Sequence, residues 1–374
     1  MEYQLVSADG HINELPDLWT KDVPGDIADL VPRVVNSETS GDMWILAPKL
    51  PPRKMGSSAA AKIDQSTGYK PTATYKEMRP GSFDPAARVE DMKIDGVQAE
   101  VLYPGQGRAL DMFANEEVRL YCARRYNDWM AEFQAAAPEH LVGLAILPQL
   151  DDGNNGSNAL NELERIAGLG LRGAFLALGI EGIPLSDPKF ESFWATASDL
   201  KIPISFHIGN SRQHWVLNQG DLGPGVREAM MSVLPMGVGD PLATLIFSGI
   251  LDRHPNLRIV LAECGIGWVP YFLQRMDAVA HKHGHVISEG MARLPSDVFR
   301  AQCFVTFQED VVGLRLHDLI GESSMMWASD YPHSETTWPD SQPTVEREFK
   351  GINDETRGRI LSKNCVELYR LDEV

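Results

Sequence analysis

The sequence predicts a single (β/α)8 barrel of the TIM type that is extended by two long insertions. Its 374 residues suit this fold, because such barrels run from about 200 to over 400 residues when their loops are enlarged. Short apolar runs alternate with helix-like segments along the chain, as expected of βα units around a parallel sheet. Eight such runs can be counted, which is the number of strands that a closed barrel requires.

The expected strands lie far enough apart in the chain for a helix to fit between them. Several are continuous runs of Val, Ile, Leu and Phe, which is typical of parallel strands that are buried on both faces. In chain order, we expect strands at residues 3–8, 97–103, 141–147, 174–178, 204–208, 259–263, 304–307 and 326–329.

Helical patterns fill several of the intervals between the strands. Two of them begin with Asp-Pro, a good helix start because proline suits the first turn. Others place apolar residues at helical spacing, as Phe272, Met276 and Val279 do. The expected helices are residues 84–95, 116–137, 188–200 and 268–281, with the closing helices within 343–371.

Two stretches exceed what a minimal barrel needs, namely residues from about 20 to 83 and residues 209–240. They follow the first and the fifth expected strand, at the end of the barrel where active sites are built. Long loops in compact domains are usually functional or disordered. We therefore expect both insertions to act as lids over a substrate pocket in one domain that spans residues 1–374.

Composition excludes some classes of protein. The net charge of -18 argues against nucleic-acid binding through a basic face and against an anionic membrane surface. The N-terminal residues lack the pattern of a signal peptide, and we read no apolar stretch of about 20 residues, so a cytoplasmic location is expected. The widely spaced cysteines form no CxxC pair, which favours free thiols; they are Cys122, Cys264, Cys303 and Cys365.

Ionisable residues follow several of the expected strands. Asp9 and His11 close the first strand and share one face, because side chains alternate along an extended chain. His207, Glu263 and Asp330 close the fifth, sixth and eighth strands. A histidine in such a place is often only a core residue. A carboxylate is more informative, because burial of an unpaired carboxylate costs several kcal/mol.

These five residues belong to the same end of different strands, which a barrel brings together around one mouth. Two imidazoles with several carboxylates form a ligand set that suits Zn, Mn or Fe. The sequence therefore predicts a divalent-metal site, with one or two ions per chain, at the mouth of the barrel.

Other residues are weaker candidates for the site. Glu14 and His281 are possible further ligands, although His281 lies in a His-rich segment that also suits a solvated helix end. Arg108, Arg212 and His214 lie on expected loops and are candidates to bind a substrate carboxylate. A role as solvated loop residues is an equal alternative for these three.

With these motifs in place, the chain resembles the amidohydrolase-related group that includes aminocarboxymuconate semialdehyde decarboxylase and the resorcylate-type decarboxylases. The segments LAECGIGWVPYFLQRMD and ASDYPHSETTWP are the most specific. The resemblance implies a metal-dependent barrel and, by position, ligand roles for Asp9, His11, His207 and Asp330. It extends over nearly the whole chain and rests on residues 7–14, 84–103, 125–129, 204–209, 249–270 and 328–338.

The chain departs from that group at two positions. The named decarboxylase has His-x-His in its first motif, where this chain has Asp9-Gly10-His11. It also has a histidine, credited with activating a metal-bound water, at the place of Glu263. The fourth strand ends without a lysine, so a carboxylated lysine that bridges two metals is not expected. The decarboxylase mechanism therefore does not transfer unchanged.

Three functions remain open. In the first, a metal-dependent hydrolase or carboxy-lyase acts on a small, carboxylate-bearing substrate, with Asp330 or Glu263 as general base. In the second, the many carboxylates hold two irons of a non-heme monooxygenase that hydroxylates C–H bonds. In the third, the barrel binds a ligand without catalysis. The expected partner is a small molecule, and a homodimer is expected by analogy.

Overall fold

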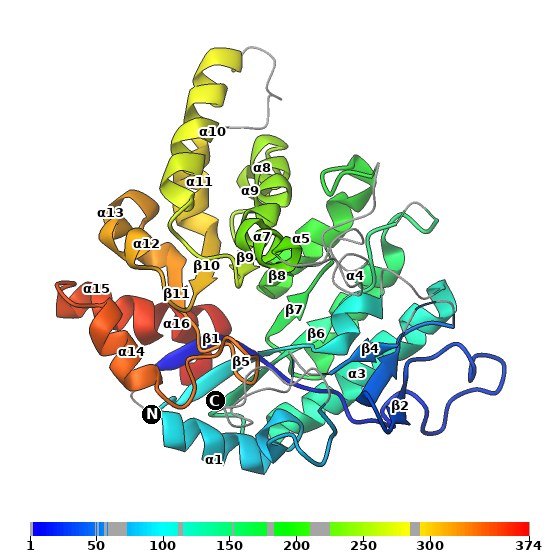
Figure 1. The fold of residues 1–374 in the computed structure, drawn as a ribbon. Coiled ribbons are helices and arrows are strands. Elements are labelled where there is room, and N and C mark those ends of the chain that lie inside the picture. The colour runs from blue at the N-terminus through cyan, green and yellow to red at the C-terminus, as the bar shows by residue number, and fades with distance from the viewer. Residues whose placement is uncertain are drawn as a thin grey trace.

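The computed structural model describes residues 3–48, 50, 52–55, 58, 73–110, 115–151, 153–177, 183–209, 225–284 and 292–373. Within these ranges, eight parallel strands form one sheet in chain order, and helices surround it (Figure 1). The predicted (β/α)8 architecture is confirmed.

Each expected strand overlaps one observed strand, and consecutive strands pair in parallel. Their side chains are almost all buried, as the apolar runs indicate. The strands are β1 Val6–His11, β5 Ala99–Tyr103, β6 Leu141–Ile146, β7 Gly173–Phe175, β8 Ile204–His207, β9 Ile259–Ala262, β10 Cys303–Phe307 and β11 Met325–Trp327.

Hydrogen bonds around the ends of the first and last strands complete the barrel. The Asp330 N–H donates to the carbonyl oxygen of Asp9 at 2.9 Å, and the His11 N–H donates to that of Tyr331 at 2.6 Å. The Ser329 N–H donates to the Ser7 hydroxyl at 2.9 Å. The segments that bear Asp9, His11 and Asp330 therefore join the two ends of the sheet.

Four expected helices are present, and their boundaries have local causes. In α1, Asp84 caps the first turn by accepting from the Ala87 N–H, and Gly96 ends the helix with a left-handed φ of 75°. The principal helices are α1 Pro85–Asp95, α3 Glu116–Ala135, α4 Ser157–Gly168, α5 Glu191–Leu200, α8 Gly239–Phe247, α9 Ile250–Arg253, α10 Val269–His283 and α11 Pro295–Gln302. The C-terminal part holds α12 Val311–Arg315, α13 His317–Ile320, α14 Ser341–Glu348, α15 Asp354–Gly358 and α16 Asn364–Tyr369.

The insertions contain regular structure that the sequence analysis did not predict. The first forms an antiparallel sheet of β2 Arg33–Ser37, β3 Gly41–Ile45 and β4 Arg53–Lys54. Beyond β4, the same insertion meets the residues that follow β1, where Asn13 Nδ2 donates to the Ser58 carbonyl oxygen at 2.9 Å. The described part of the second insertion contains helix α7, Val226–Val233.

One helical stretch, Glu228–Phe247, runs through α7, a 3-10 turn and α8. The stretch is 20 residues long, and an 18-residue window within it has a mean hydropathy of 1.4, so by length and composition alone it is sufficient to cross a membrane. The sequence analysis did not anticipate such a stretch. About two fifths of this window (39%) is buried inside the protein, and core helices also meet the same criteria. The four cysteines are free and buried, as expected.

Candidate metal centre

The predicted ligands lie together at the mouth of the barrel. Asp9 and His11 belong to β1, His207 ends β8, and Glu263 directly follows β9. Asp330 comes three residues after β11. All are almost fully buried except Glu263, whose side chain is 18% exposed. Parallel strands of a barrel place their C-terminal ends around one opening, which explains this convergence.

Distances between side-chain atoms define the cluster. His11 Nε2 lies 3.3 Å from Asp330 Oδ1 and 3.6 Å from Asp9 Oδ1. His207 Nε2 lies 3.0 Å from Glu263 Oε2 and 3.2 Å from His11 Nε2. Two sets of candidate ligand atoms, each mutually within 4.8 Å, share His11. One set is Asp9, His11 and His207, and the other is His11, Glu263, Asp330 and His333.

Two of the carboxylates sit on unusual backbone. Glu263 has a φ of 55° and Asp330 a φ of 56°, in the left-handed region that non-glycine residues seldom adopt. Such conformations persist where the surrounding structure imposes them, and they concentrate at functional sites. Here they end the strands with a sharp turn at the mouth of the barrel.

Burial and mutual repulsion govern the acidic groups. Burial raises the pKa of Asp9 and of Asp330 well above the usual carboxyl range, and the charge of neighbouring carboxylates raises both further. Burial also acts to raise the pKa of Glu263, but its hydrogen bond to His207 and nearby positive charges outweigh burial and lower the pKa to about 2. Asp9 Oδ1 and Asp330 Oδ2 accept no hydrogen bond from the described residues. A divalent cation fits this set, because it would neutralise the charges and coordinate the unsatisfied oxygens.

The imidazoles of His11 and His207 are also in a form that can bind a metal ion. Burial lowers the pKa of His11, and burial followed by the charge of Arg108 lowers that of His207 to about 4. Neutral imidazole is the form that binds metals. His11 Nδ1 lies 3.4 Å from the Pro104 carbonyl oxygen, which leaves Nε2 facing the carboxylates.

We expect the buried His207 and His333 to make the metal-free protein less stable as the pH falls from about 6.5 to about 4. Burial lowers the pKa of His207 and of His333 to about 4, whereas the ordinary value is 6.5. The unfolded chain therefore binds more protons over this interval, so stability rises with pH by at most about 1.4 kcal/mol per pH unit for each group. The raised pKa values of Asp9 and Asp330 act in the opposite direction.

Comparison of variants isolates the contribution of the buried histidine to the pH dependence of stability. Thermal unfolding at several pH values should show a shallower loss for His333→Gln than for the wild type. The matched control is His281→Gln, since His281 is exposed on α10. Equal pH dependence for all three proteins would contradict the assignment.

His333 is a member of the cluster that the sequence analysis did not assign to the site. Its Nδ1 atom lies 2.9 Å from Asp330 Oδ1, and its ring stacks on that of His11 with centroids 4.0 Å apart. In the sequence, the position of His333 three residues after Asp330, in a segment with other polar residues, could have indicated this role. The turn between Asp330 and His333, in which the His333 N–H donates to the Asp330 carbonyl oxygen at 2.9 Å, places the imidazole in the cluster.

Arg108 is the candidate substrate-binding residue that the structure places at the mouth. It lies in the 3-10 turn Gln106–Ala109, and its Nη1 atom is 2.7 Å from His207 Nδ1. Its positive charge therefore borders the candidate ligands. Arg212 and His214 lie outside the described residues.

Two candidate ligands do not join the cluster. Glu14 is fully buried and accepts the backbone N–H groups of Gly105, Gln106 and Gly107 at 2.8 to 3.0 Å, so it stabilises the loop after β5 instead. Burial raises the pKa of Glu14, and these hydrogen bonds lower it in part. His281 is exposed on the last turns of α10, which project away from the strands (Figure 1). The solvated helix end is the correct interpretation of His281.

A buried ion pair supports the backbone beneath the cluster. Arg88 Nε donates to Glu100 Oε2 at 2.7 Å, and the same guanidinium donates to the carbonyl oxygens of His11 and Tyr331 at 2.8 and 3.1 Å. A Cβ atom on Gly10 would lie 2.0 Å from Glu100 Oε1. The glycine between Asp9 and His11 is therefore required by the close approach of this pair.

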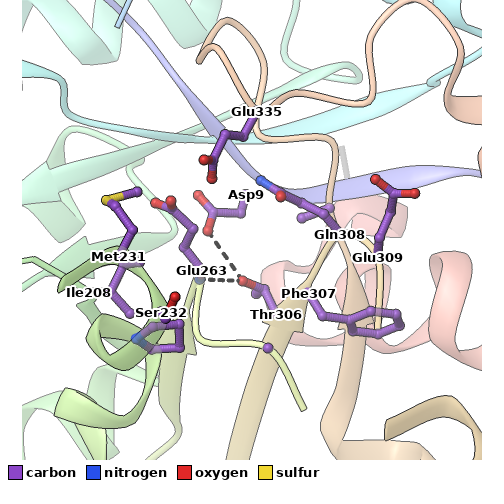
Figure 2. A pocket seen from close by; sticks show the side chains of 13 residues that line it. Asp9, Ile208, Met231, Ser232, Glu263, Thr306, Phe307, Gln308, Glu309 and Glu335 are labelled. Carbon is purple, nitrogen blue, oxygen red and sulfur yellow. Dashed lines mark hydrogen bonds between the residues drawn. The ribbon is translucent and has the colours of Figure 1, made fainter. Parts of the chain in front are cut away.

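A cavity of about 330 Å³ borders the cluster. Figure 2 shows Asp9 and Glu263 facing it, with Glu335 and Gln308 extending toward the same space. Met231 of the second insertion also lines it. A cavity of this size accommodates a small organic molecule.

A parallel barrel with buried imidazoles and carboxylates at its C-terminal mouth defines a class of metal-dependent enzymes. The sequence profile of the amidohydrolase family matches residues 8–371, and the chain belongs to this family. The predicted resemblance is confirmed.

Curated relatives extend over most of the chain. It is 27% identical over 335 residues to a gamma-resorcylate decarboxylase of Rhodococcus jostii, a match that covers 83% of this chain and 95% of the relative. It is 23% identical to a 2-amino-3-carboxymuconate-6-semialdehyde decarboxylase of Dictyostelium discoideum, with 80% of each chain covered.

Solved structures show the same fold. An amidohydrolase from Mycobacterium avium subsp. paratuberculosis superimposes with a TM-score of 0.77 at 19% identity, covering 99% of this chain and 98% of its own. A dihydroxybenzoic acid decarboxylase from Polaromonas, with bound manganese and an inhibitor, gives a TM-score of 0.66 at 19% identity, covering 100% and 98%. The chain is thus a metal-dependent enzyme of the hydrolase or carboxy-lyase type, and these relatives give no support to the di-iron oxygenase or to a non-catalytic barrel.

Proposed function

We propose that this chain is a metal-dependent decarboxylase of a small aromatic acid. The observation that carries the proposal is the buried cluster of imidazoles and carboxylates that opens onto a cavity of about 330 Å³. The curated relatives named above, which span at least 80% of the chain, support carboxy-lyase chemistry over hydrolysis. Two dihydroxybenzoate-type decarboxylases among the similar structures favour an aromatic substrate.

Asp9, His11, His207 and Asp330 would hold the cation. A divalent ion held there would polarise the oxygens of the substrate. Manganese is the first choice, because the Polaromonas decarboxylase contains it. One ion is the minimum, and the second ligand set around Glu263 and His333 offers a place for another.

Decarboxylation breaks the bond between a ring carbon and its carboxylate, and the carbon keeps the electron pair. That carbon must take up a proton as carbon dioxide leaves. Asp330, which pairs with His333 Nδ1 at 2.9 Å, is the candidate to pass this proton. Arg108, beside His207, is placed to bind an oxygen of the substrate.

Release of carbon dioxide tests the proposed reaction. Protein stripped of metal and reloaded with Mn²⁺ is incubated with 2,6-dihydroxybenzoate and with 5-carboxyvanillate, and the gas and the remaining acid are quantified. We expect one carbon dioxide per substrate consumed, dependence on the metal, and unchanged turnover in the His281→Gln control.

Other outcomes would identify a different reaction. Hydrolysis of amides or esters without carbon dioxide release from either acid would favour a hydrolase. Two irons per chain together with oxygen uptake in the presence of substrate would restore the monooxygenase alternative. Either result would overturn the decarboxylase proposal.

A further inference from the structure

Thr306 lies beside the cluster, although its side chain is not a candidate metal ligand. It is the penultimate residue of β10 and is fully buried. Its hydroxyl accepts the backbone N–H of Glu263 at 2.8 Å and donates to Asp9 Oδ2 at 3.2 Å (Figure 2). One hydroxyl group therefore connects residues of β1 and β10 with the residue that follows β9.

The direction of these two hydrogen bonds is fixed. A backbone amide can only donate, so the Thr306 oxygen must be the acceptor in its bond with Glu263. The hydroxyl has a single proton, which it donates to Asp9 when that carboxylate is ionised, the form that binds a cation. Asp9 Oδ2 is thereby held as an acceptor on the side of β10.

The hydrogen bond from Thr306 to Asp9 determines which oxygen of Asp9 is available to a metal ion. Oδ1 accepts no hydrogen bond from the described residues and lies 3.6 Å from His11 Nε2. Loss of the Thr306 bond would let the carboxylate rotate and remove this distinction between its oxygens. The hydroxyl therefore presents Oδ1 to the centre of the cluster.

The hydrogen bond from the Glu263 backbone N–H to Thr306 fixes the backbone that carries the second carboxylate. The last β9–β10 pair in the register is Leu261 with Val305, so the Glu263 N–H lies beyond the paired part of the strands. The Thr306 hydroxyl accepts a hydrogen bond from this N–H instead, and Glu263 itself has a φ of 55°. Beyond this turn, the Asp310 carboxylate accepts the N–H groups of Ile266 and Gly267, each at 2.7 Å. β10 and the segment after it thus hold both ends of the loop that carries Glu263.

We propose that Thr306 is a positioning residue of the metal centre, which orients the Asp9 carboxylate and fixes the backbone from which the Glu263 side chain reaches the cluster. This inference rests on the metal centre in the proposed function. Partners that orient metal ligands typically contribute about 10- to 100-fold to metal affinity. The hydroxyl of Thr306 is expected to have an effect of this size.

The test compares Thr306→Val, which keeps the shape and removes the hydroxyl, with Thr306→Ser, which keeps the hydroxyl. Mn²⁺ binding to stripped protein is measured by titration of the free-ion electron paramagnetic resonance signal. We expect Thr306→Val to bind Mn²⁺ about 10- to 100-fold more weakly than the wild type. Thr306→Ser should remain within about threefold, well inside that range.

A matched control measures the general effect of such a substitution. Thr356 is also buried, and its hydroxyl accepts a hydrogen bond from Asn353 at 3.0 Å on helix α15. Thr356→Val should leave Mn²⁺ affinity unchanged. If Thr306→Val does not fold, Thr306→Ala serves as the hydroxyl-free variant.

The outcomes separate this inference from the proposed reaction. Equal Mn²⁺ affinity of the wild type and the hydroxyl-free variant would overturn the role of Thr306, even if decarboxylation is observed. Weakened binding that serine restores would support the role, even if no aromatic acid is decarboxylated. A wild type that binds no Mn²⁺ would overturn both.

Discussion

Asp330→Asn is expected to weaken divalent-metal binding and to reduce activity by at least about 100-fold, the upper end of the effect of outer-shell changes. Asparagine keeps the shape of the side chain but removes its negative charge. Asp330 Oδ1 lies 3.3 Å from His11 Nε2 and 2.9 Å from His333 Nδ1, so the change affects the middle of the cluster. Metal content by elemental analysis and carbon dioxide release measure the two losses.

The same substitution should stabilise the metal-free protein. Burial and the charge of Glu263 raise the pKa of Asp330, which means that its ionised form is unfavourable in the fold. Asparagine carries no charge to be buried, so metal-free Asp330→Asn should unfold at a higher temperature than metal-free wild type. Asp318→Asn, on helix α13, is the control and should change neither metal content nor activity. Full metal occupancy in Asp330→Asn would contradict its role as a ligand.

Arg88→Met should cost about 3–5 kcal/mol of stability, as expected when one partner of a buried ion pair is removed. Arg88 is fully buried and bonds to Glu100 and to the carbonyl oxygens of His11, Gly81 and Tyr331. Methionine fills most of the volume but leaves the carboxylate and the carbonyl groups without their donor. Urea-induced unfolding of the metal-free protein gives the change in free energy.

An exposed ion pair provides the comparison. Arg347 pairs with Glu309, and both side chains are more than half exposed. Arg347→Met should change stability by less than about 1 kcal/mol, as surface pairs usually do. Replacement of Glu100 by Gln in the Arg88→Met protein should recover part of the loss, since no buried charge is then unpaired. A cost below about 1 kcal/mol for Arg88→Met would show that the pair is dispensable.

The features that the sequence predicted well are those with a local pattern or a simple topology. All eight strands were visible as apolar runs, because parallel strands in a barrel are buried on both faces. The convergence of Asp9, His207 and Asp330 follows from the barrel itself, since residues that end different strands must share one mouth. No knowledge of side-chain conformation was needed for either result.

The errors concern contacts that no local pattern encodes. Glu14 is acidic and close to β1, but its carboxylate turns to the N–H groups of the loop after β5. The direction of α10 decides the exposure of His281, and a helical repeat does not reveal where a helix points. The strands β2 to β4 are short and only half-buried, so their sequence resembles that of a loop.

The closure of the barrel has a consequence for how the protein acquires its metal during synthesis. Ser7 and Ser329, which are hydrogen-bonded beside the cluster, are 322 residues apart in the chain. The N-terminal ligands leave the ribosome long before Asp330 exists, so a nascent chain has no complete coordination sphere. The ligand set that includes Asp330 is therefore complete only after nearly the entire polypeptide has been made. A bound ion would link the first and last strands, so its release should weaken the contact between them.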